Sequence, residues 1–223
     1  MRIHLPNIHK YLSLLLQFIL CLGMCTALWE REWSTAVLTF VIILLTLIPL
    51  LVYKRFKVFI PPEFEVLATA FLFAALFLGE IEGYYTRFWW WDIALHTTSG
   101  FLLGIVGFLL AHILNEQERI ELKMQPIFVA MFSFFFAVSI GAMWEIFEFA
   151  MDSLVGTNMQ KPMLDDPSGL TDTMWDLIVD TLGALLISVM GYGYLKSAGN
   201  QSFLLRWIHK FIRKNPHLFQ QSE

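Results

Sequence analysis

Hydrophobic residues along this chain gather in repeated long stretches, separated by short polar segments. Six stretches are close to the roughly 20 residues that a helix needs to cross the hydrocarbon core of a bilayer. We place them at residues 11–29, 34–53, 64–82, 92–114, 126–152 and 173–195. The pattern predicts an all-α, polytopic membrane helix bundle of about six transmembrane helices. Pro61 and Pro62 open the third helix and Pro126 opens the fifth, at positions where a missing N–H is tolerated.

Composition supports the same class. Of the 223 residues, 57% are hydrophobic and 15% are charged, whereas about a quarter of the residues of a soluble domain are charged. No repeat or second domain is evident, so we predict a single membrane domain over residues 1–223. Residues 203–214 place apolar and basic residues on opposite faces at helical spacing, which predicts an amphipathic helix lying in the cytoplasmic headgroups and contacting membrane lipids.

Lysine and arginine predict the orientation, because they are retained on the cytoplasmic side of short loops. With the N-terminus inside, 12 of the 15 basic residues lie inside. These are Arg2, Lys10, Lys54, Arg55, Lys57, Arg119, Lys123, Lys196, Arg206, Lys210, Arg213 and Lys214. Only Arg31, Arg87 and Lys161 are then outside. We therefore expect both termini to be cytoplasmic, in a bacterial plasma membrane.

Acidic residues are distributed in the opposite sense, with thirteen of the 19 outside or in the outer half. They are Glu30, Glu32, Glu80, Glu82, Asp92, Glu145, Glu148, Asp152, Asp165, Asp166, Asp172, Asp176 and Asp180. A surface of that sign concentrates cations and repels anions. The distribution therefore suggests no nucleic-acid partner, and it argues against an arginine or lysine clamp for phosphate groups on this side.

Three of the predicted helices carry ionisable residues at the outer end of one polar or small-residue face. The residues are Asp92 and His96, then Glu145, Glu148 and Asp152, then Asp176 and Asp180. Such a face must meet protein rather than lipid, and Gly100 and Gly104 allow a neighbouring helix to approach closely. Charged groups within a span cost at least about 2.5 to 3.5 kcal/mol on insertion scales, so a functional role is the default interpretation.

Carboxylates brought together in this way repel one another, so either several are protonated or a cation lies among them. Oxygen ligands with one imidazole suit a divalent ion such as Mg²⁺, Mn²⁺, Ca²⁺, Zn²⁺ or iron. The alternative is a structural polar network, in which Asp92 and Asp172 cap their helices. For Asp92 and Asp152 the two interpretations are about evenly balanced, whereas a shared functional site is favoured for the other five residues.

Several motifs lie along residues 61–184 of the chain: P-P-E-F-E-V at 61–66, G-E at 79–80, W-W-D-x-x-L-H-x-x-S-G at 90–100, W-E-I-F-E-F at 144–149, N-M-Q at 158–160 and D-T-M-W-D-L-x-x-D-x-x-G-A at 172–184. Together these motifs resemble the YjdF family of uncharacterised bacterial inner-membrane proteins. The acidic and histidine motifs resemble, more loosely, the VanZ-like membrane proteins linked to glycopeptide-antibiotic tolerance. Glu148 and Asp180 stand where VanZ-like chains tend to have Gln and Asn, which makes this chain more acidic.

Neither resemblance assigns a reaction, because a fold is not a function. Three classes stay open from the residues. The first is a metal-assisted enzyme acting on an envelope lipid or a lipid-linked headgroup, with the metal near His96. The second is a cation- or proton-coupled transporter, which needs an inward path past Asp180. The third is a structural or partner-binding membrane protein, which needs neither.

Overall fold

A computed structural model describes residues 8–116, 124–197, 210, 211 and 213–216 of the chain. The described residues are almost entirely helical, and the only pairing of strand type among them is a single bridge between Met163 and Asp166. They form two compact units, one of residues 8–91, 210, 211 and 213–216 and one of residues 92–116 and 124–197. Each unit is a helical assembly with its own buried residues, so each is described separately.

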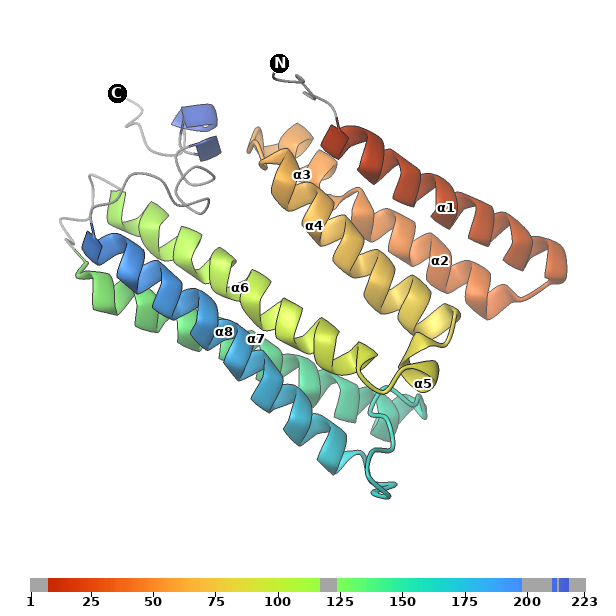
Figure 1. The fold of residues 1–223 in the computed structure, drawn as a ribbon. Helices are drawn as coiled ribbons and strands as arrows, with labels where there is room; N and C mark the ends of the chain where they lie inside the picture. The colour runs from red at the N-terminus through yellow and green to blue at the C-terminus, as the bar shows by residue number, and fades with distance from the viewer. Residues whose placement is uncertain (1–7, 117–123, 198–209, 212, 217–223) are drawn as a thin grey trace, which may run out of the picture. The chain divides into compact units, whose positions relative to one another are not determined.

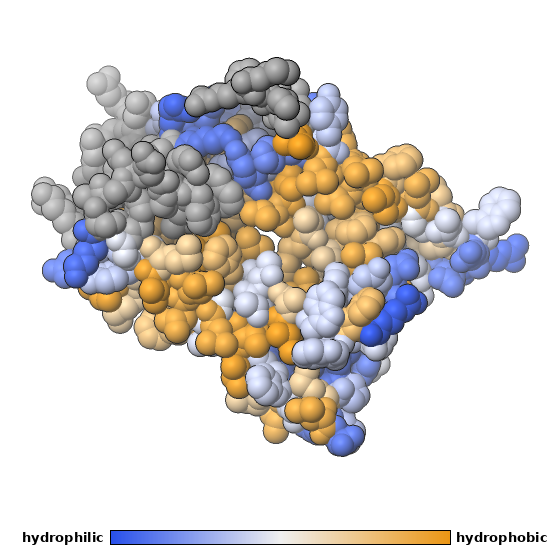
Figure 2. Space-filling model, viewed as in Figure 1, coloured by the Kyte–Doolittle hydropathy of each residue, from blue (hydrophilic) through white to orange (hydrophobic). Residues whose placement is uncertain are grey.

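Five described helices have the length and hydropathy of a membrane span, and the count rises to six if one bent pair is a single span. The five are residues 8–30, 62–81, 91–111, 126–155 and 170–193. Large apolar side chains are exposed along them, and Figure 2 shows hydrophobic residues over much of the visible surface. Because lipid solvates such surfaces, the chain is a multi-pass helical membrane protein, as the sequence predicted.

The first unit begins with α1 (Ile8–Glu30), α2 (Trp33–Thr46) and α3 (Ile48–Phe56). The predicted span 34–53 covers α2 and α3, which are bent by 41° relative to each other. Pro49 lies in the first turn of α3, where it lacks an N–H and its ring would clash with the preceding turn of a continuous helix. The hydropathy pattern predicted helix over these residues and did not predict the break between α2 and α3.

The unit continues with α4 (Pro62–Leu72), η1 (Phe73–Ile81) and α5 (Tyr84–Arg87). Element η1 is a π-helix, in which Glu82 N donates to Phe77 O five residues earlier, whereas the sequence predicted α-helix to residue 82. The indole Nε1 of Trp91 donates to Ala74 O at 3.3 Å, so the widened segment has a side-chain donor on its backbone. Helices α1, α2 and α4 lie side by side around Leu20, Ile42 and Phe77 (Figure 1).

The described C-terminal residues belong to this first unit. Asn215 is fully buried, accepts a hydrogen bond from Phe59 N and donates to the carbonyl oxygens of Phe59 and Phe211. Lys210 Nζ lies 2.7 and 2.8 Å from the two carboxylate oxygens of Glu63. Residues 203–209 and 212 of the predicted amphipathic helix lie outside the described residues, and the described residues 210, 211, 213 and 214 are helical.

The described helices of the second unit are α6 (Trp91–Glu116), whose first residue Trp91 belongs to the first unit, α7 (Pro126–Val155) and α8 (Leu170–Ser197). Glycines bring α6 and α8 into backbone contact, because a Cβ at Gly100 would collide with the Asp180 carbonyl and a Cβ at Gly183 with the Thr97 carbonyl. Further along, Ser133 of α7 donates to the Gly104 carbonyl of α6 at 2.6 Å. These close crossings bring the polar faces of the three helices together, in line with the small-residue stripes.

Candidate functional site

The site lies at one end of the second unit, where α6 begins, α7 ends and α8 begins (Figure 1). Helix α6 contributes Asp92 and His96, which are one turn apart, and α7 contributes Glu145 and Glu148. Helix α8 contributes Asp172, Asp176 and Asp180, again separated by single turns. Residues three or four apart lie on one helical face, so each helix directs a row of ionisable groups toward the same volume.

The imidazole of His96 is the centre of this cluster. Its Nε2 lies 3.5 Å from Asp92 Oδ1 and 3.8 Å from Asp176 Oδ2. Its Nδ1 lies 3.4 Å from Asp180 Oδ2 and 3.8 Å from Glu145 Oε1. One ring therefore faces four carboxylates from three helices, two on each nitrogen.

Most of these carboxylates are withdrawn from solvent. Glu145, Asp172, Asp176 and Asp180 are between 1% and 3% exposed. Five of their buried oxygens have no hydrogen-bond partner among the described residues: both of Glu145, both of Asp176, and Oδ1 of Asp172. A buried carboxylate without hydrogen bonds is costly, so these oxygens fit a site that takes up a positively charged ligand.

The Asp180 carboxylate contacts both α6 and α7. The Ser99 hydroxyl lies 2.5 Å from Asp180 Oδ1 and 2.8 Å from the His96 carbonyl oxygen, so it can donate to either. On the α7 side the carboxylate packs against Gly141, where an added Cβ would be 2.6 Å from Oδ2. A side chain at Gly100 would collide with the Asp180 backbone, and one at Gly141 would collide with its carboxylate, so both glycines are needed for Asp180 to pack between α6 and α7.

Glu148 and Asp152, two predicted site residues, make contacts away from the His96 ring. Glu148 is 8% exposed and accepts a hydrogen bond from Trp144 Nε1 at 2.8 Å. Asp152 accepts hydrogen bonds from Thr157 Oγ1, Met159 N and Gln160 N, at 2.6 to 2.9 Å. Asp152 therefore organises the loop that follows α7, while its role as a ligand stays a prediction.

Asp172 is a buried member of the cluster that the predicted site residues did not include. Its place at the start of a predicted span suggested a helix cap, yet it is 2% exposed. Its Oδ2 accepts from Lys161 N at 2.7 Å, and Gln160 Nε2 donates to the neighbouring Thr173 hydroxyl at 2.6 Å. The one-turn spacing from Asp172 through Asp176 to Asp180 was the signal that could have identified it.

Asp166 lies outside the spans, in the loop between α7 and α8, and its carboxylate is hydrogen-bonded within that loop. Its carboxylate accepts from the side chain and the backbone N of Ser168 and from the N and hydroxyl of Thr171. These hydrogen bonds, those of Ser168 first, hold the pKa of Asp166 well below its ordinary value. The acid therefore stays ionised and fixes the start of α8, and these contacts do not involve the His96 ring.

Three side chains of the cluster have the spacing of metal ligands. Single ligand atoms of Asp92, His96 and Asp176 all lie within 4.8 Å of one another. Ligand bonds of 2.0 to 2.1 Å in a tetrahedral zinc site place ligand atoms about 3.4 Å apart. The Nε2 distances of 3.5 and 3.8 Å to the two aspartates are slightly longer than this value, so the three side chains could hold an ion after the ligand atoms move closer together.

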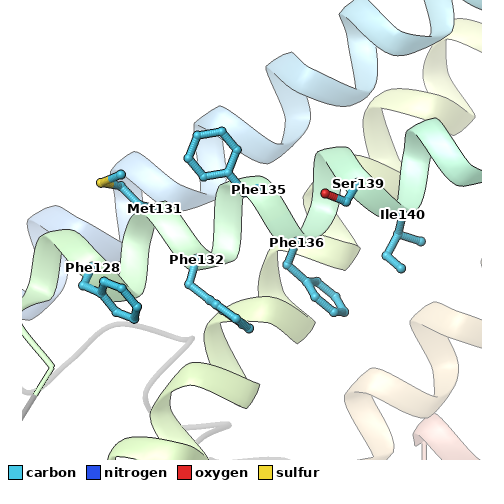
Figure 3. Close-up of a pocket in the computed structure, with 7 residues that line it drawn as sticks. All are labelled: Phe128, Met131, Phe132, Phe135, Phe136, Ser139 and Ile140. Carbon is cyan, nitrogen blue, oxygen red and sulfur yellow. The ribbon is translucent and has the colours of Figure 1, made fainter. Parts of the chain in front are cut away.

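A separate hollow lies along α7 and is apolar. It has a volume of about 440 Å³ and is lined by Phe128, Met131, Phe132, Phe135, Phe136, Ser139 and Ile140, all from α7 (Figure 3). Phe128, Met131 and Phe135 are at least half exposed, as lipid-facing side chains are. Ser139 contributes the only side-chain polar group among the lining residues, and the carboxylates of the cluster are not among them.

Comparison with known proteins places the chain in a family. Residues 11–197 match the family described as "Predicted membrane protein (DUF2238)", and the chain belongs to it. A Thermotoga maritima protein named "Uncharacterized protein" is 26% identical over 133 residues, which are 60% of this chain and 64% of that protein. The chain thus spans less than two thirds of the length of that relative. No solved structure matches the chain.

Proposed function

We propose that this member of the DUF2238 family binds a divalent cation through its His96 and carboxylate cluster, at the extracytoplasmic end of a bacterial plasma-membrane helix bundle. The observation that carries the proposal is the set of buried carboxylate oxygens of Glu145, Asp172 and Asp176 that lack a hydrogen-bond partner among the described residues. A cation is the ligand that would compensate them.

Electrostatics supports a cation over a purely structural network. Two like charges 4 Å apart repel by about 4 kcal/mol at an effective dielectric constant of about 20. His96 supplies at most one positive charge to the four carboxylates of Asp92, Glu145, Asp176 and Asp180, which lie 3.4 to 3.8 Å from it. Either protons or a metal ion must supply the rest, and a divalent ion does so at one position.

The donor set favours some ions over others. Asp92, His96 and Asp176 form the candidate primary ligand set, with Glu145 and Asp180 on the other side of the imidazole. One imidazole with two carboxylates suits Mn²⁺, iron or Zn²⁺ better than Mg²⁺ or Ca²⁺, which prefer oxygen ligands throughout. Glu148, Asp152 and Asp172 would add negative potential around the ion.

The distribution of charge along the chain supports the sidedness. With both termini cytoplasmic, 12 of the 15 basic residues lie inside, and the loop from 156 to 169 with the cluster lies outside. The motif resemblance to the YjdF family agrees with a bacterial inner-membrane location. The looser VanZ-like resemblance stays a hypothesis about the same acidic positions.

Packing below the cluster favours a binding site over a transport path. Beyond Asp180, a Cβ at Gly104 would collide with Ile187, and the Ser133 hydroxyl is fully buried against the Gly104 carbonyl. The side chains of Asp92 and His96, in contrast, are 16% and 12% exposed. The cluster is therefore accessible at the end of the bundle, and close-packed residues lie beneath it.

A metal-assisted enzyme is the second candidate, because three protein ligands leave a coordination position for water or substrate, as in catalytic zinc sites. A lipid headgroup at the membrane surface would be within reach of such a position. This candidate rests on the same ligand set, and it requires the ion to be bound first.

Thermal unfolding of the detergent-purified protein tests the binding proposal. The parent and Asp176→Asn are compared in chelator and then with Mn²⁺, Zn²⁺, Mg²⁺ or Ca²⁺ in turn. An ion that binds only the folded state at about 100 times its Kd stabilises it by about 2.7 kcal/mol. We expect one or more ions to raise the melting temperature of the parent, and Asp176→Asn to lose that response.

The sign of the difference in melting temperature between Asp176→Asn and the parent, measured in chelator, is equally informative. Because Asp176 makes no hydrogen bond among the described residues, removing its charge relieves repulsion, so Asp176→Asn should match or exceed the stability of the parent. Asp165→Asn is the control, since Asp165 is exposed and its positive φ of 63° is tolerated by Asn. A parent indifferent to every ion, with Asp176→Asn much less stable than it, would decide for a structural network.

A further inference from the structure

The two nitrogens of the His96 ring have different surroundings. Nδ1 lies 3.4 Å from Asp180 Oδ2, within hydrogen-bond range. Glu145 Oε1 lies 3.8 Å from the same nitrogen. Nε2 faces Asp92 at 3.5 Å and Asp176 at 3.8 Å. Both oxygens of Asp176 and both of Glu145 are buried without a hydrogen-bond partner among the described residues. The two edges of the ring therefore differ in Asp180, whose other oxygen contacts Ser99, and in the ligand atoms of Asp92, His96 and Asp176, which lie within 4.8 Å of one another.

Residues of α6 and α7 fix the position of Asp180. Ser99 contacts its Oδ1, the backbone of Asp180 lies against Gly100, and Gly141 confines Oδ2 from the α7 side. These contacts direct Oδ2 at Nδ1. In known metal sites, a ligating histidine donates its other N–H to a carboxylate, which fixes the ring orientation and raises the basicity of the ligand nitrogen.

We infer that Asp180 is a positioning residue: it holds the proton on Nδ1 of His96, so that Nε2 is the nitrogen that meets the cation beside Asp92 and Asp176. The inference rests on the proposed function for the identity of the ligand. Ser99 acts with Asp180, because its hydroxyl contacts the Asp180 carboxylate that faces the His96 ring. Glu145, 3.8 Å from Nδ1, is the other acid on that edge.

This assignment gives different roles to three predicted ligands and to a pair of residues behind the imidazole. Asp92, His96 and Asp176 would contact the ion, whereas Asp180 and Ser99 would act through the imidazole. Loss of an outer partner of this kind lowers metal affinity by about 10- to 100-fold without removing a ligand. If Asp180 had only a structural role, its loss would change the stability of the protein. It would leave unchanged which ring nitrogen of His96 carries the proton.

Nitrogen NMR of histidine-labelled protein reads the ring directly. The chain has six histidines, so the His96 signals are identified by their loss in His96→Gln. With chelator present, we expect Nδ1 to carry a proton, and with Zn²⁺ we expect Nδ1 to keep it while the Nε2 signal shifts. An unprotonated Nδ1 in chelator, or coordination of Zn²⁺ by Nδ1, would overturn the inference.

Zn²⁺ affinity of variants supplies the second measurement. Asp180→Ala and Ser99→Ala should each bind Zn²⁺ about 10- to 100-fold more weakly than the parent. Thr98→Ala is the matched control, because Thr98 is exposed and donates to Ala94 O of its own helix, and it should bind as the parent does. Asp180→Ala with parental affinity would refute the positioning role, and Ser99→Ala answers the same question if Asp180→Ala does not fold.

The two proposals fail separately. If the parent binds none of the ions, the proposed function is lost, yet the proton on Nδ1 in chelator still decides whether Asp180 orients the ring. If the parent binds Zn²⁺ through Nδ1, the proposed function stands and the role of Asp180 falls.

Discussion

Gly141 of α7 faces the carboxylate of Asp180 on α8 so closely that a Cβ at this glycine would lie 2.6 Å from Oδ2. The absence of a side chain on one helix therefore creates the space for a charged side chain on another. This contact connects the packing of the second unit to the geometry of the site, because the same Oδ2 is 3.4 Å from His96 Nδ1.

Gly141→Ala should therefore disturb both stability and ion binding. The added methyl must displace the Asp180 carboxylate, and overpacking of this kind costs about 1–3 kcal/mol. Thermal unfolding with and without Zn²⁺ measures both effects. Gly193→Ala is the control, because Gly193 is helical with open space around it, and alanine there should be neutral or stabilising by up to about 1 kcal/mol. Equal melting temperatures and equal responses to Zn²⁺ in the two variants would show that Gly141 does not confine the Asp180 carboxylate.

Ser133→Ala should affect stability alone. The Ser133 hydroxyl is buried and donates to Gly104 O at 2.6 Å, so its loss leaves one acceptor position empty and costs about 1 kcal/mol. The ion-dependent rise in melting temperature should persist. Ser139→Ala, at an exposed position on the same helix, should change neither quantity. If Ser133→Ala abolished the ion response, the site would extend deeper than Asp180.

Asp152→Ala should loosen the loop after α7. Three hydrogen bonds from Thr157, Met159 and Gln160 would lose their acceptor, so limited proteolysis between residues 156 and 162 should become faster. The ion-dependent rise in melting temperature should remain, because the Asp152 carboxylate is hydrogen-bonded to the loop and, among the described residues, not to the His96 cluster. A variant with intact loop protection but no ion response would instead make Asp152 a ligand, as the sequence allowed.

Asn215→Ala should destabilise the first unit. The variant leaves the Phe59 N–H and carbonyl without their partner, and each unsatisfied buried group costs about 1–3 kcal/mol. Chemical unfolding in detergent measures the loss. Arg213→Ala, at an exposed position two residues earlier, should leave unfolding unchanged. Equal stability of both variants with the parent would show that the C-terminal residues are not held at Phe59.

The topology makes a prediction independent of any ligand. Reporters fused after Ser222, in the loop at Arg55 and in the loop at Arg119 should all report the cytoplasm, and a reporter at Gly156 should report the outside. A cytoplasmic signal from the Gly156 fusion would place the His96 cluster on the inner side of the membrane, and the proposed sidedness would be abandoned.

The sequence was sufficient for the helices that could span a membrane, because length and hydropathy are local properties. Predicted and observed bounds agree within a few residues, for example 126–152 against Pro126–Val155 and 173–195 against Leu170–Ser197. Helical spacing also identifies which residues share a face, and it is enough to group Asp92, His96, Glu145, Asp176 and Asp180. The break at Pro49 and the π-helix from Phe73 to Ile81 were not predicted, because a hydropathic run looks the same whether its backbone bends or widens.

Only the tertiary structure decided which atoms each acid contacts. Spacing along a helix sets the direction of a side chain, but the rotation and axial offset of neighbouring helices set which atoms meet. Here glycine contacts between α6 and α8 and at Gly141 of α7 determine that offset. They place Asp180 on Nδ1 of His96 and Asp92 and Asp176 on Nε2, while the chain after α7 turns back onto Asp152. Acidic residues with the same spacing along the chain therefore have different contacts, because the atoms they meet belong to other helices or loops.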